Sequence, residues 1–456
     1  MSFIVKAVKS VVKAVVNVVK AVVKAVVDVV TSVVNFAIQA FMPGMPGVDS
    51  ASEAARQQGV LLQREGSDIS IPVIYGHRKV GGTIAYMETG STNNKFLWVA
   101  YILGEGQVEG LRELWIDDNP LPAGIIGQLN GGATVTIAEG RYKGRVTLRF
   151  SPGVYYANPA ASPLAAEVRG NIFSGAPSFA SDMYYNGLAV VFARYEWFEI
   201  KTQEQQDANP FGGGVPKLQA CVLGRRVATL VNSTSESYTY GGAGYAERYS
   251  TNPAEILLDY LRNPRYGKGL SNSEIDWASW RTAARKLDTA VAYYGGGPTG
   301  AIITNNSVID TAQTLSNNVK ILLQGMRGYM PYVQGKYKLR IEDAGNETDI
   351  LSGSATITAI ATTSPATTQN DIGSVYVDIM GDITYTGIER SAKYTQVAVT
   401  YVDPDQGWSN QQAVWPETEA ERQTFVTADG GRENATEVTM GTITNRYMAL
   451  YGPTYL

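Results

Sequence analysis

The first 42 residues alternate apolar and polar positions with a helical period. Between residues 4 and 35 most positions are Val or Ala, and a polar residue recurs every three or four positions. The repeat is eleven residues long, about 3.67 residues per turn, so the polar residues form a nearly straight stripe on a helix. The stripe residues are Lys6, Lys9, Lys13, Asn17, Lys20, Lys24 and Asp28. The pattern predicts a long amphipathic helix over residues 1–42.

This helix cannot be stable alone in water, because its surface outside the stripe is Val and Ala. Its charges leave no uncharged apolar run of about 18–20 residues, so it is not a standard transmembrane span. Its dispersed lysines also disfavour a signal peptide. Three interpretations remain: a bundle of identical helices with polar stripes inward, a helix lying in a membrane interface, or a helix docked in a protein tube or groove.

After residue 42 the pattern changes to that of a globular protein. Residues 43–66 form a linker in which Pro43, Gly44, Pro46 and Gly47 end the helix. Residues 67–230 contain short runs of β-branched and aromatic residues separated by Gly, Asn and Pro, which predicts β-rich domains resembling barrels or sandwiches.

Residues 231–326 contain a loop and then a helical period. Asn252 can cap a helix that has Pro253 at its first position and Glu255 at its third. Ser271 and Glu274 have the spacing of a capping box before a second helix. A third helix is predicted from Ser307 to about Met326.

Residues 327–456 are predicted to be a C-terminal β-rich domain. A hairpin with a Gln334-Gly335 turn comes first, and strands are expected over 373–402 and 424–444. The whole order indicates an α+β fold, mainly β, with several barrel- or sandwich-like domains, a short helical insert and the long N-terminal amphipathic helix.

The composition excludes some classes of function but says little more about the fold. The chain has 456 residues, 18% of them charged, and a net charge of −4. Broad nucleic-acid binding through a basic surface is therefore disfavoured. The single cysteine, Cys221, excludes a disulfide framework within the chain and is interpreted as a buried strand residue.

Candidate chemistry is sparse. His77 is the only histidine and is interpreted as an exposed strand-end residue rather than a base. The glycines of 295–300 follow a predicted helix and are interpreted as a loop. Asp403-Pro404-Asp405 resembles the start of a calcium loop but lacks the acidic twelfth residue. Adjacent Asp117 and Asp118 are expected in a solvated turn rather than in a glycosidase pair. No cofactor, metal site or catalytic residue is predicted, and an enzyme is disfavoured.

Several sequence segments resemble, in the same order along the chain, segments of the tail tip hub proteins of long-tailed phages, the lambda-like tip attachment family. They cover roughly residues 67–443, and NPAEILLDYLRNPRYGKGL is the most specific. The phrases are IPVIYGHRKVGG (71–82), LGEGQVEGLRELWIDDNPL (103–121), GLAVVFARY (187–195), VPKLQACVLGRRV (215–227), NPAEILLDYLRNPRYGKGL (252–270) and GDITYTGIERSAKYTQVAVTYVDPDQGW (381–408). The positions that match the family's motifs are Tyr75, Gly76, Gly104, Gly106, Gly110, Asn252, Pro253, Asp259, Tyr266, Gly267, Asp403 and Pro404.

The resemblance implies a homotrimer at the virion tail tip that closes the tail tube and opens for DNA ejection. It implies contact with distal tail protein, tape measure protein and tip or fibre proteins, with DNA only in passage. The N-terminal helix would then be a lumen plug or a segment that enters the host membrane. Family members are usually longer. The resemblance therefore implies that this chain is either a minimal hub or a fragment of a longer protein. The alternatives are a tail-associated enzyme that degrades the cell envelope and a membrane-active pore-forming protein.

Overall fold

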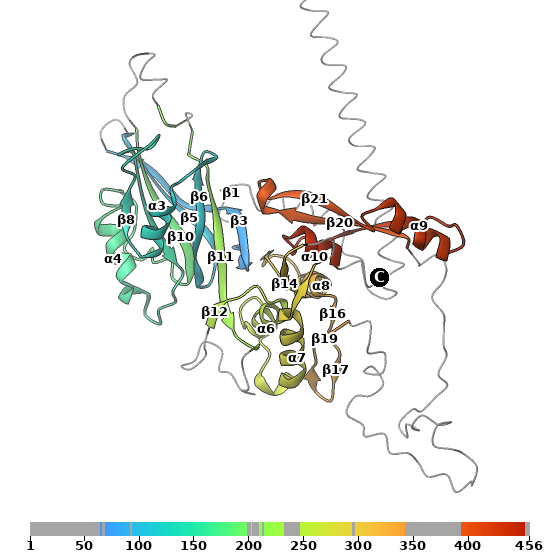
Figure 1. Cartoon of the computed structure of the whole chain (residues 1–456). Coiled ribbons are helices and arrows are strands. Elements are labelled where there is room, and N and C mark those ends of the chain that lie inside the picture. The colour runs from blue at the N-terminus through green and yellow to red at the C-terminus, as the bar shows by residue number, and fades with distance from the viewer. Residues whose placement is uncertain are drawn as a thin grey trace, which may run out of the picture.

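A computed structural model describes residues 64–65, 69–91, 94–197, 202, 209–211, 214–231, 247–293, 297–342 and 394–451. The predicted helix over 1–42 lies outside the described residues. So do most of the linker and residues 373–393 of an expected strand region. The described chain forms three parts, which we call the first lobe, the helical lobe and the C-terminal sheet (Figure 1).

The first lobe consists of two sheets that pack face to face. One sheet has the order β1 (Arg64–Glu65), β4 (Thr83–Gly90), β5 (Phe96–Glu105), β10 (Leu188–Glu196), β9 (Val146–Pro152) and β8 (Thr134–Thr136). The other has the order β12 (Glu247–Tyr249), β11 (Leu218–Ala228), β6 (Val108–Ile116) and β7 (Asn119–Pro120). The strand β3 (His77–Gly81) pairs with β11 on the side opposite β6. The sandwich-like architecture predicted for this region is confirmed.

The central strands of the first lobe are buried on both faces. Along β5, Val99 and Tyr101 enter the core between the sheets, where the helix α3 (Ala123–Asn130) also contributes apolar side chains. The alternate residues Trp98 and Ala100 pack under α4 (Pro163–Gly170) and the loop that follows it. This double cover explains why β5 is a continuous hydrophobic run rather than an alternating one.

The helical lobe packs three helices around a second core. They are α6 (Pro253–Arg262), α7 (Trp277–Asp288) and α8 (Leu315–Met326), with the short helix η3 (Asn272–Glu274) before α7. The capping box of Ser271 and Glu274 caps η3, whereas Asp276 caps α7. Two strand pairs complete the lobe: β2 (Val73–Tyr75) with β15 (Ser307–Ile309), and β13 (Ala290–Ala292) with β14 (Thr299–Ala301).

The prediction that the third helix begins at Ser307 is wrong. Ser307–Ile309 forms β15, and the helix begins at Leu315 with Thr314 as its cap. The reason is non-local, since β15 pairs with β2, more than 200 residues earlier in the chain. The predicted loop over 295–300 is also wrong in part, because Gly300 lies in β14 and pairs with Val291 of β13.

The predicted hairpin after the helices is present. It consists of β16 (Gly328–Tyr329), β17 (Tyr332–Val333), β18 (Lys336–Tyr337) and β19 (Arg340–Ile341), paired antiparallel. Gln334 and Gly335 have φ of 54° and 77°, the left-handed backbone that a two-residue hairpin turn requires. Leu339 is buried in the helical core, so the hairpin is anchored by its second arm.

The C-terminal sheet has the order β21 (Ser409–Trp415), β20 (Gln396–Asp403) and β22 (Ala435–Thr439). The short helix η7 (Pro404–Gln406) joins β20 to β21, and α10 (Arg446–Tyr451) contributes to the core on one face. The expectation of strands throughout 424–444 is wrong in part, because α9 (Glu419–Ala428) occupies its beginning. A capping box of Thr418 and Glu421 starts that helix.

Within the described residues, the helices are too short or too polar to cross a bilayer.

Candidate functional site

The only histidine lies at a contact between lobes. His77 begins β3 and is half-buried, with its ring edge-on to Trp408 at a centroid distance of 5.7 Å. Burial, reinforced by the charges of Arg112 and Arg78, lowers the pKa of His77 to about 4. The ring is therefore neutral near pH 7. His77 lies at a strand end as expected, but the expectation that it is exposed is wrong.

The other candidate reactive groups have structural surroundings. Cys221 is buried in β11, as expected, and burial raises the pKa of its thiol to about 12, so the nucleophilic thiolate is scarce. Asp117 and Asp118 form a tight turn with φ of 48° and 62°. The Oδ1 of Asp117 accepts a 2.8 Å hydrogen bond from the backbone N of Lys217, which agrees with the interpretation as a turn.

The motif residues Asp403 and Pro404 also build a turn. The Oδ1 of Asp403 accepts a 2.9 Å hydrogen bond from the backbone N of Asp405, which caps η7. Across the described ranges, no group of three or more His, Cys, Asp or Glu is placed to hold a metal ion. Several buried polar residues instead converge where the lobes meet.

The first junction is the bend between β2 and β3, at Gly76. β2 pairs with β15 of the helical lobe and β3 pairs with β11 of the first lobe. Gly76 has a φ of 63°, and a Cβ at this position would lie 2.2 Å from the backbone oxygen of Asn305. Only glycine fits this bend, because both the backbone conformation and the space exclude a side chain.

Asn306 connects the Gly76 bend to the C-terminal sheet. Its side chain is buried, and its Oδ1 accepts a 2.9 Å hydrogen bond from the backbone N of His77. Its Nδ2 donates to the Oγ1 of Thr444 at 2.6 Å, and its backbone N donates to the oxygen of Thr442 at 2.8 Å. One amide therefore joins the ends of three segments that are far apart in the sequence.

A buried carboxylate forms the second junction. The hydroxyl of Tyr75 donates to the Oδ2 of Asp259 at 2.6 Å, and the Nε of Arg225 donates to the same oxygen at 2.9 Å. Tyr75 and Asp259 are at most 1% exposed. Gly106 lies against this group, since a Cβ there would be 1.9 Å from the Nη1 of Arg225. Three motif positions that are distant in sequence thus meet around one arginine.

Two further motif glycines allow close packing within the first lobe. A Cβ on Gly104 would lie 3.1 Å from the backbone oxygen of Pro72. A Cβ on Gly110 would lie 2.9 Å from the Oδ1 of Asn130, whose amide bonds the backbone N and O of Leu111 at 2.8 Å each. These positions hold α3 and the chain before β2 against the sheets.

Tyr266 and Gly267 shape the end of α6. The ring of Tyr266 stacks on Tyr260 with a centroid distance of 6.0 Å. A Cβ on Gly267 would lie 1.8 Å from the backbone oxygen of Tyr260, so the chain can turn this tightly only with glycine. The adjacent Arg265 forms a 3.3 Å ion pair with Glu105 of the first lobe.

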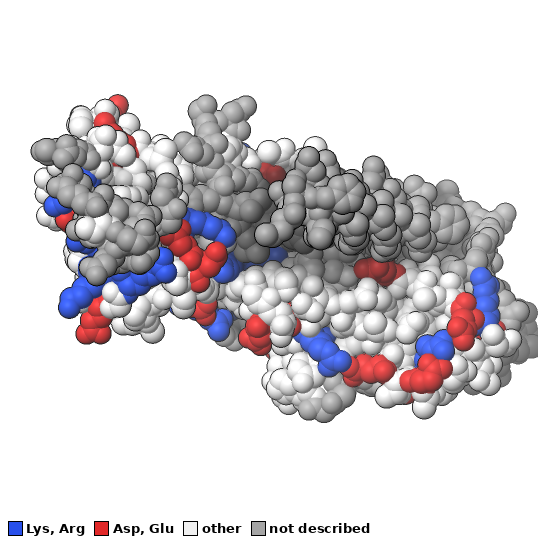
Figure 2. Space-filling view, turned by 90° about the horizontal axis from the view of Figure 1, so that it is seen from above, with Lys and Arg blue, Asp and Glu red and all other residues white. Residues whose placement is uncertain are grey.

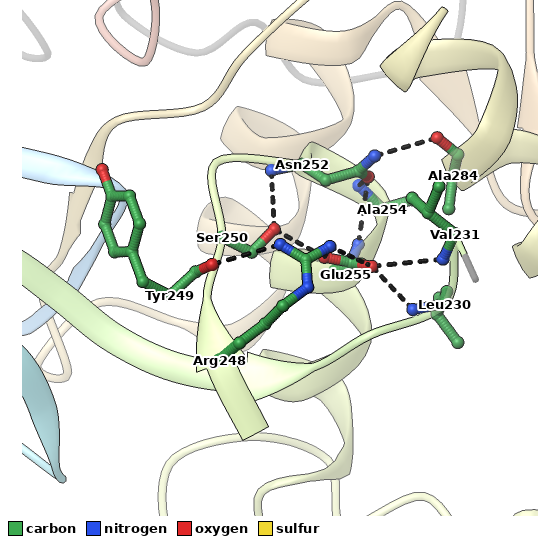
Figure 3. Close-up of polar contacts among 9 residues, drawn as sticks. All are labelled: Leu230, Val231, Arg248, Tyr249, Ser250, Asn252, Ala254, Glu255 and Ala284. Atoms are coloured by element: carbon green, nitrogen blue, oxygen red, sulfur yellow. Dashed lines mark hydrogen bonds and ion pairs between the residues drawn. The ribbon is translucent and has the colours of Figure 1, made fainter. Parts of the chain in front are cut away.

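Asn252 and Pro253 start α6 as the sequence predicts. The Oδ1 of Asn252 accepts from the backbone N of Ala254 at 3.0 Å, and its Nδ2 donates to the backbone oxygen of Ala284 at 2.8 Å (Figure 3). The cap residue therefore also joins α6 to α7.

Glu255 has a role beyond the start of α6. Its side chain is fully buried and faces the end of β11 (Figure 3). Its Oε1 accepts hydrogen bonds from the backbone N of Leu230 at 2.6 Å and of Val231 at 3.3 Å. Its Oε2 accepts from Ser250 Oγ at 2.5 Å and from Arg248 Nη2 at 3.2 Å. One carboxylate thereby joins the residues after β11 and the strand β12, both in the first lobe, to the first helix of the helical lobe.

Sequence reasoning missed Asn306, Arg225 and the second role of Glu255. Arg225 lies inside a segment that resembles the family, VPKLQACVLGRRV. This resemblance was the only feature of the sequence that pointed to a role for Arg225. The N-terminal stripe residues, Lys6 to Asp28, lie outside the described residues.

Charges on the outside are mixed in sign. On the described part of the face in Figure 2, Lys and Arg side chains are interleaved with Asp and Glu. This distribution agrees with the sequence-based expectation against broad binding of nucleic acid through this face.

Comparison with known proteins finds an extended similarity to a phage protein. The chain is 20% identical over 422 residues to "Baseplate hub protein pb3" of Escherichia phage T5, which covers 83% of this chain and 40% of that protein. The chain thus spans less than half the length of this curated relative. A chain in a solved structure of the virion of a native gene transfer agent particle aligns with a TM-score of 0.49 and 13% identity. That alignment covers 95% of this chain and 82% of the other. No protein-family model matches the sequence.

Proposed function

We propose that this chain is the structural hub at the distal end of a phage tail, because it is similar over most of its length to a phage baseplate hub protein. The similarity extends over 83% of the chain, which is longer than any one of the three parts of the fold. The proposed location is the tail tip of the virion, and the proposed role is mechanical.

The observation that carries the proposal is the set of buried polar junctions between lobes. Arg225–Asp259, Asn306–Thr444 and Glu255–Leu230 each join different parts of the fold. Buried polar groups that are hydrogen-bonded favour a unique arrangement, because a displacement removes their partners in a low-dielectric interior. A hub that transmits force between attached proteins requires such a rigid body.

We propose further that three copies close the tail tube and join distal tail protein, tape measure protein and tip or fibre proteins. Within the described residues, β8 and β7 lie at the ends of their sheets, and closed symmetry is one way to cover such edges. DNA would contact the hub only during passage.

The eleven-residue repeat supports a proposal for the N-terminal helix as a lumen plug or a membrane-interacting segment. A peptide of residues 1–42 should bind anionic vesicles and release an enclosed dye if the membrane role holds. If it neither binds nor releases dye, the docking interpretation of the helix is favoured.

The structural role is tested on the intact protein and particle. We expect mass photometry of the full chain to find three copies, and a gold-labelled antibody to bind at the tail tip in electron micrographs. Labelling elsewhere, or release of soluble fragments from peptidoglycan that is lost on substituting one carboxylate, would favour an envelope-degrading enzyme. A soluble monomer that permeabilises vesicles would favour the pore-forming alternative.

A further inference from the structure

Two elements in the described part of the chain have little cover from the rest. The first is the tip of the hairpin, where Tyr332 is 60% exposed, Val333 is 42% exposed and Tyr329 is 40% exposed. A two-stranded hairpin is marginally stable unless it packs against something. Leu339 anchors one arm in the helical core, but the tip extends beyond that anchor.

The second element is the helix α9. Among its ten residues only Val426 is buried, and Phe425 is 40% exposed with its ring near Trp415. Helices in proteins derive most of their stability from packing an apolar face. A helix with one buried residue and an exposed phenylalanine therefore has the character of a contact surface.

The two elements carry opposite charge. Residues 327–342 contain four basic residues and one acidic residue, a net charge of +3. Residues 416–433 contain five acidic and two basic residues, a net charge of −3. The basic set is Arg327, Lys336, Lys338 and Arg340, opposed by Glu342; the acidic set is Glu417, Glu419, Glu421, Asp429 and Glu433, opposed by Arg422 and Arg432. Lys338 and Glu417 are ion-paired with Asp276 and Arg446 outside these ranges, and counting these partners leaves +2 and −2. Each surface thus offers apolar groups and a charge that complements the other.

These surfaces are separate within one chain. Figure 1 shows the hairpin on the helical lobe and α9 at the far end of the C-terminal sheet. The lobes that carry them are joined by the buried bonds of Asn306 and by Arg78, which is 2% exposed and whose Nη1 donates to the backbone oxygen of Gly441 at 3.4 Å. Bringing the two surfaces together in one copy would break these buried contacts.

We propose that the hairpin tip of one copy docks on α9 of a neighbouring copy of this chain. A contact between two different surfaces of identical subunits is heterologous, and it closes into a ring when the rotation between copies allows. The inference rests on the proposed function, because it assigns the surfaces that build the proposed trimer. Tyr332 and Phe425 would supply the apolar centre, and the surrounding charges would set the orientation.

Cross-linking tests the contact directly. A photoreactive phenylalanine derivative replaces Tyr332 in the full chain, and equal amounts of isotopically light and heavy protein are mixed. We expect cross-linked peptides that join position 332 to residues 419–428 of the other isotopic form. The control position is Tyr155, which is 74% exposed on the first lobe and should give no such peptide.

Charge reversal provides an independent test. Lys336→Glu and Thr427→Lys lie at exposed positions of the hairpin and α9, and each alone should raise the dissociation constant of the assembly about tenfold. In the double variant the introduced carboxylate and ammonium can pair where the two positions meet, so its affinity should exceed that of Lys336→Glu alone. Lys143→Glu, at an exposed turn of the first lobe, should leave assembly unchanged, and unchanged melting curves would show that every variant is folded.

The outcomes separate this inference from the proposed function. A wild-type chain that stays monomeric contradicts the proposed trimer. A wild-type trimer whose position 332 cross-links elsewhere, or only within the same chain, overturns the hairpin–α9 contact and leaves the trimer in place. Failure of the double variant to recover affinity also counts against the contact.

Discussion

The hydroxyl of Tyr75 donates a 2.6 Å hydrogen bond to the carboxylate of Asp259, a residue 184 positions further along the chain. Tyr75 ends β2 and Asp259 lies in the middle of α6, so this bond crosses from one phrase of the family motif to another. Arg225 shares the same carboxylate oxygen at 2.9 Å. The bond ties the orientation of α6 to the bend that leads into the first lobe.

Tyr75→Phe should lower the free energy of unfolding by about 1.5–3 kcal/mol, because it removes a hydrogen bond to a buried charged group. Urea unfolding followed by tryptophan fluorescence measures the change. Tyr155→Phe is the matched control at an exposed position and should stay within about 0.5 kcal/mol of the wild type. Equal effects of the two substitutions would remove the argument for this junction.

Gly76→Ala should destabilise the protein more than Gly335→Ala. Both glycines have positive φ, so both variants incur a backbone cost of about 1–2 kcal/mol. A Cβ on Gly335 meets nothing within 4 Å, whereas on Gly76 it meets the oxygen of Asn305 at 2.2 Å. We expect an additional cost of about 1–3 kcal/mol at Gly76 from the forced displacement. Differential scanning calorimetry compares the two, and similar melting temperatures would contradict the crowded bend.

Glu255→Gln should destabilise the protein by about 2–4 kcal/mol. The amide keeps the size of the side chain, but its NH₂ would face donors such as the backbone N of Leu230 and leave buried groups unpaired. Hydrogen exchange should increase at Leu230 and Val231, since both donate to Glu255. Glu139→Gln, at an exposed position, serves as the control. Unchanged exchange at both amides would show that Glu255 does not hold the end of β11.

His77 should remain neutral until the solution is strongly acidic. Its folded pKa of about 4 lies below its ordinary value of 6.5, so the unfolded chain binds the proton first as pH falls. The stability from the neutral ring is present above pH 6.5 and is lost between about pH 6.5 and 4, by at most about 1.4 kcal/mol per pH unit.

Because His77 is the only histidine, histidine-labelled protein gives a single imidazole signal whose titration reports this pKa directly. His77→Gln should show a smaller loss of stability between pH 7 and 5 than the wild type does. A midpoint near pH 6.5 would contradict the buried environment.

Cys221 should resist thiol reagents in the folded protein. Burial raises its pKa to about 12, and the reactive thiolate is therefore both rare and inaccessible near pH 8. A chromogenic disulfide reagent should react with less than one thiol per chain until denaturant is added, and then with one. Full and rapid reaction of the native protein would show that the thiol of Cys221 in β11 is accessible to the reagent.

Local patterns predicted the elements whose causes are local. The hairpin after Arg327 follows from its alternating strand and its Gln334-Gly335 turn. The start of α6 follows from the capping geometry of Asn252 and Pro253. The burial of Cys221 follows from its apolar strand. In each case the residues that determine the structure are neighbours in the sequence.

The errors arise where distant residues compete with local preference. Ser307–Ile309 resembles the start of a helix but pairs with β2, because the strand pairing buries Ile309 and Asn306 accepts a hydrogen bond from the bend after Gly76. The position of His77 depends on Trp408, which follows more than 300 residues later. The helix α9 was missed because β-branched residues such as Val426 and Thr427 favour strands, whereas its capping box lies ahead of them.

The sequence by itself determined the period of the N-terminal repeat, the mainly β fold, and the order of phrases that resembles phage hub proteins. Each of these features follows from residue types and their spacing along the chain, so it can be predicted without knowing which distant residues are in contact. Only the tertiary structure decided that Tyr75, Gly106 and Asp259 meet around Arg225, and that Asn306 holds three segments together. Such junctions depend on which distant groups become neighbours in the interior, where an unpaired polar group is costly and a paired one fixes the arrangement.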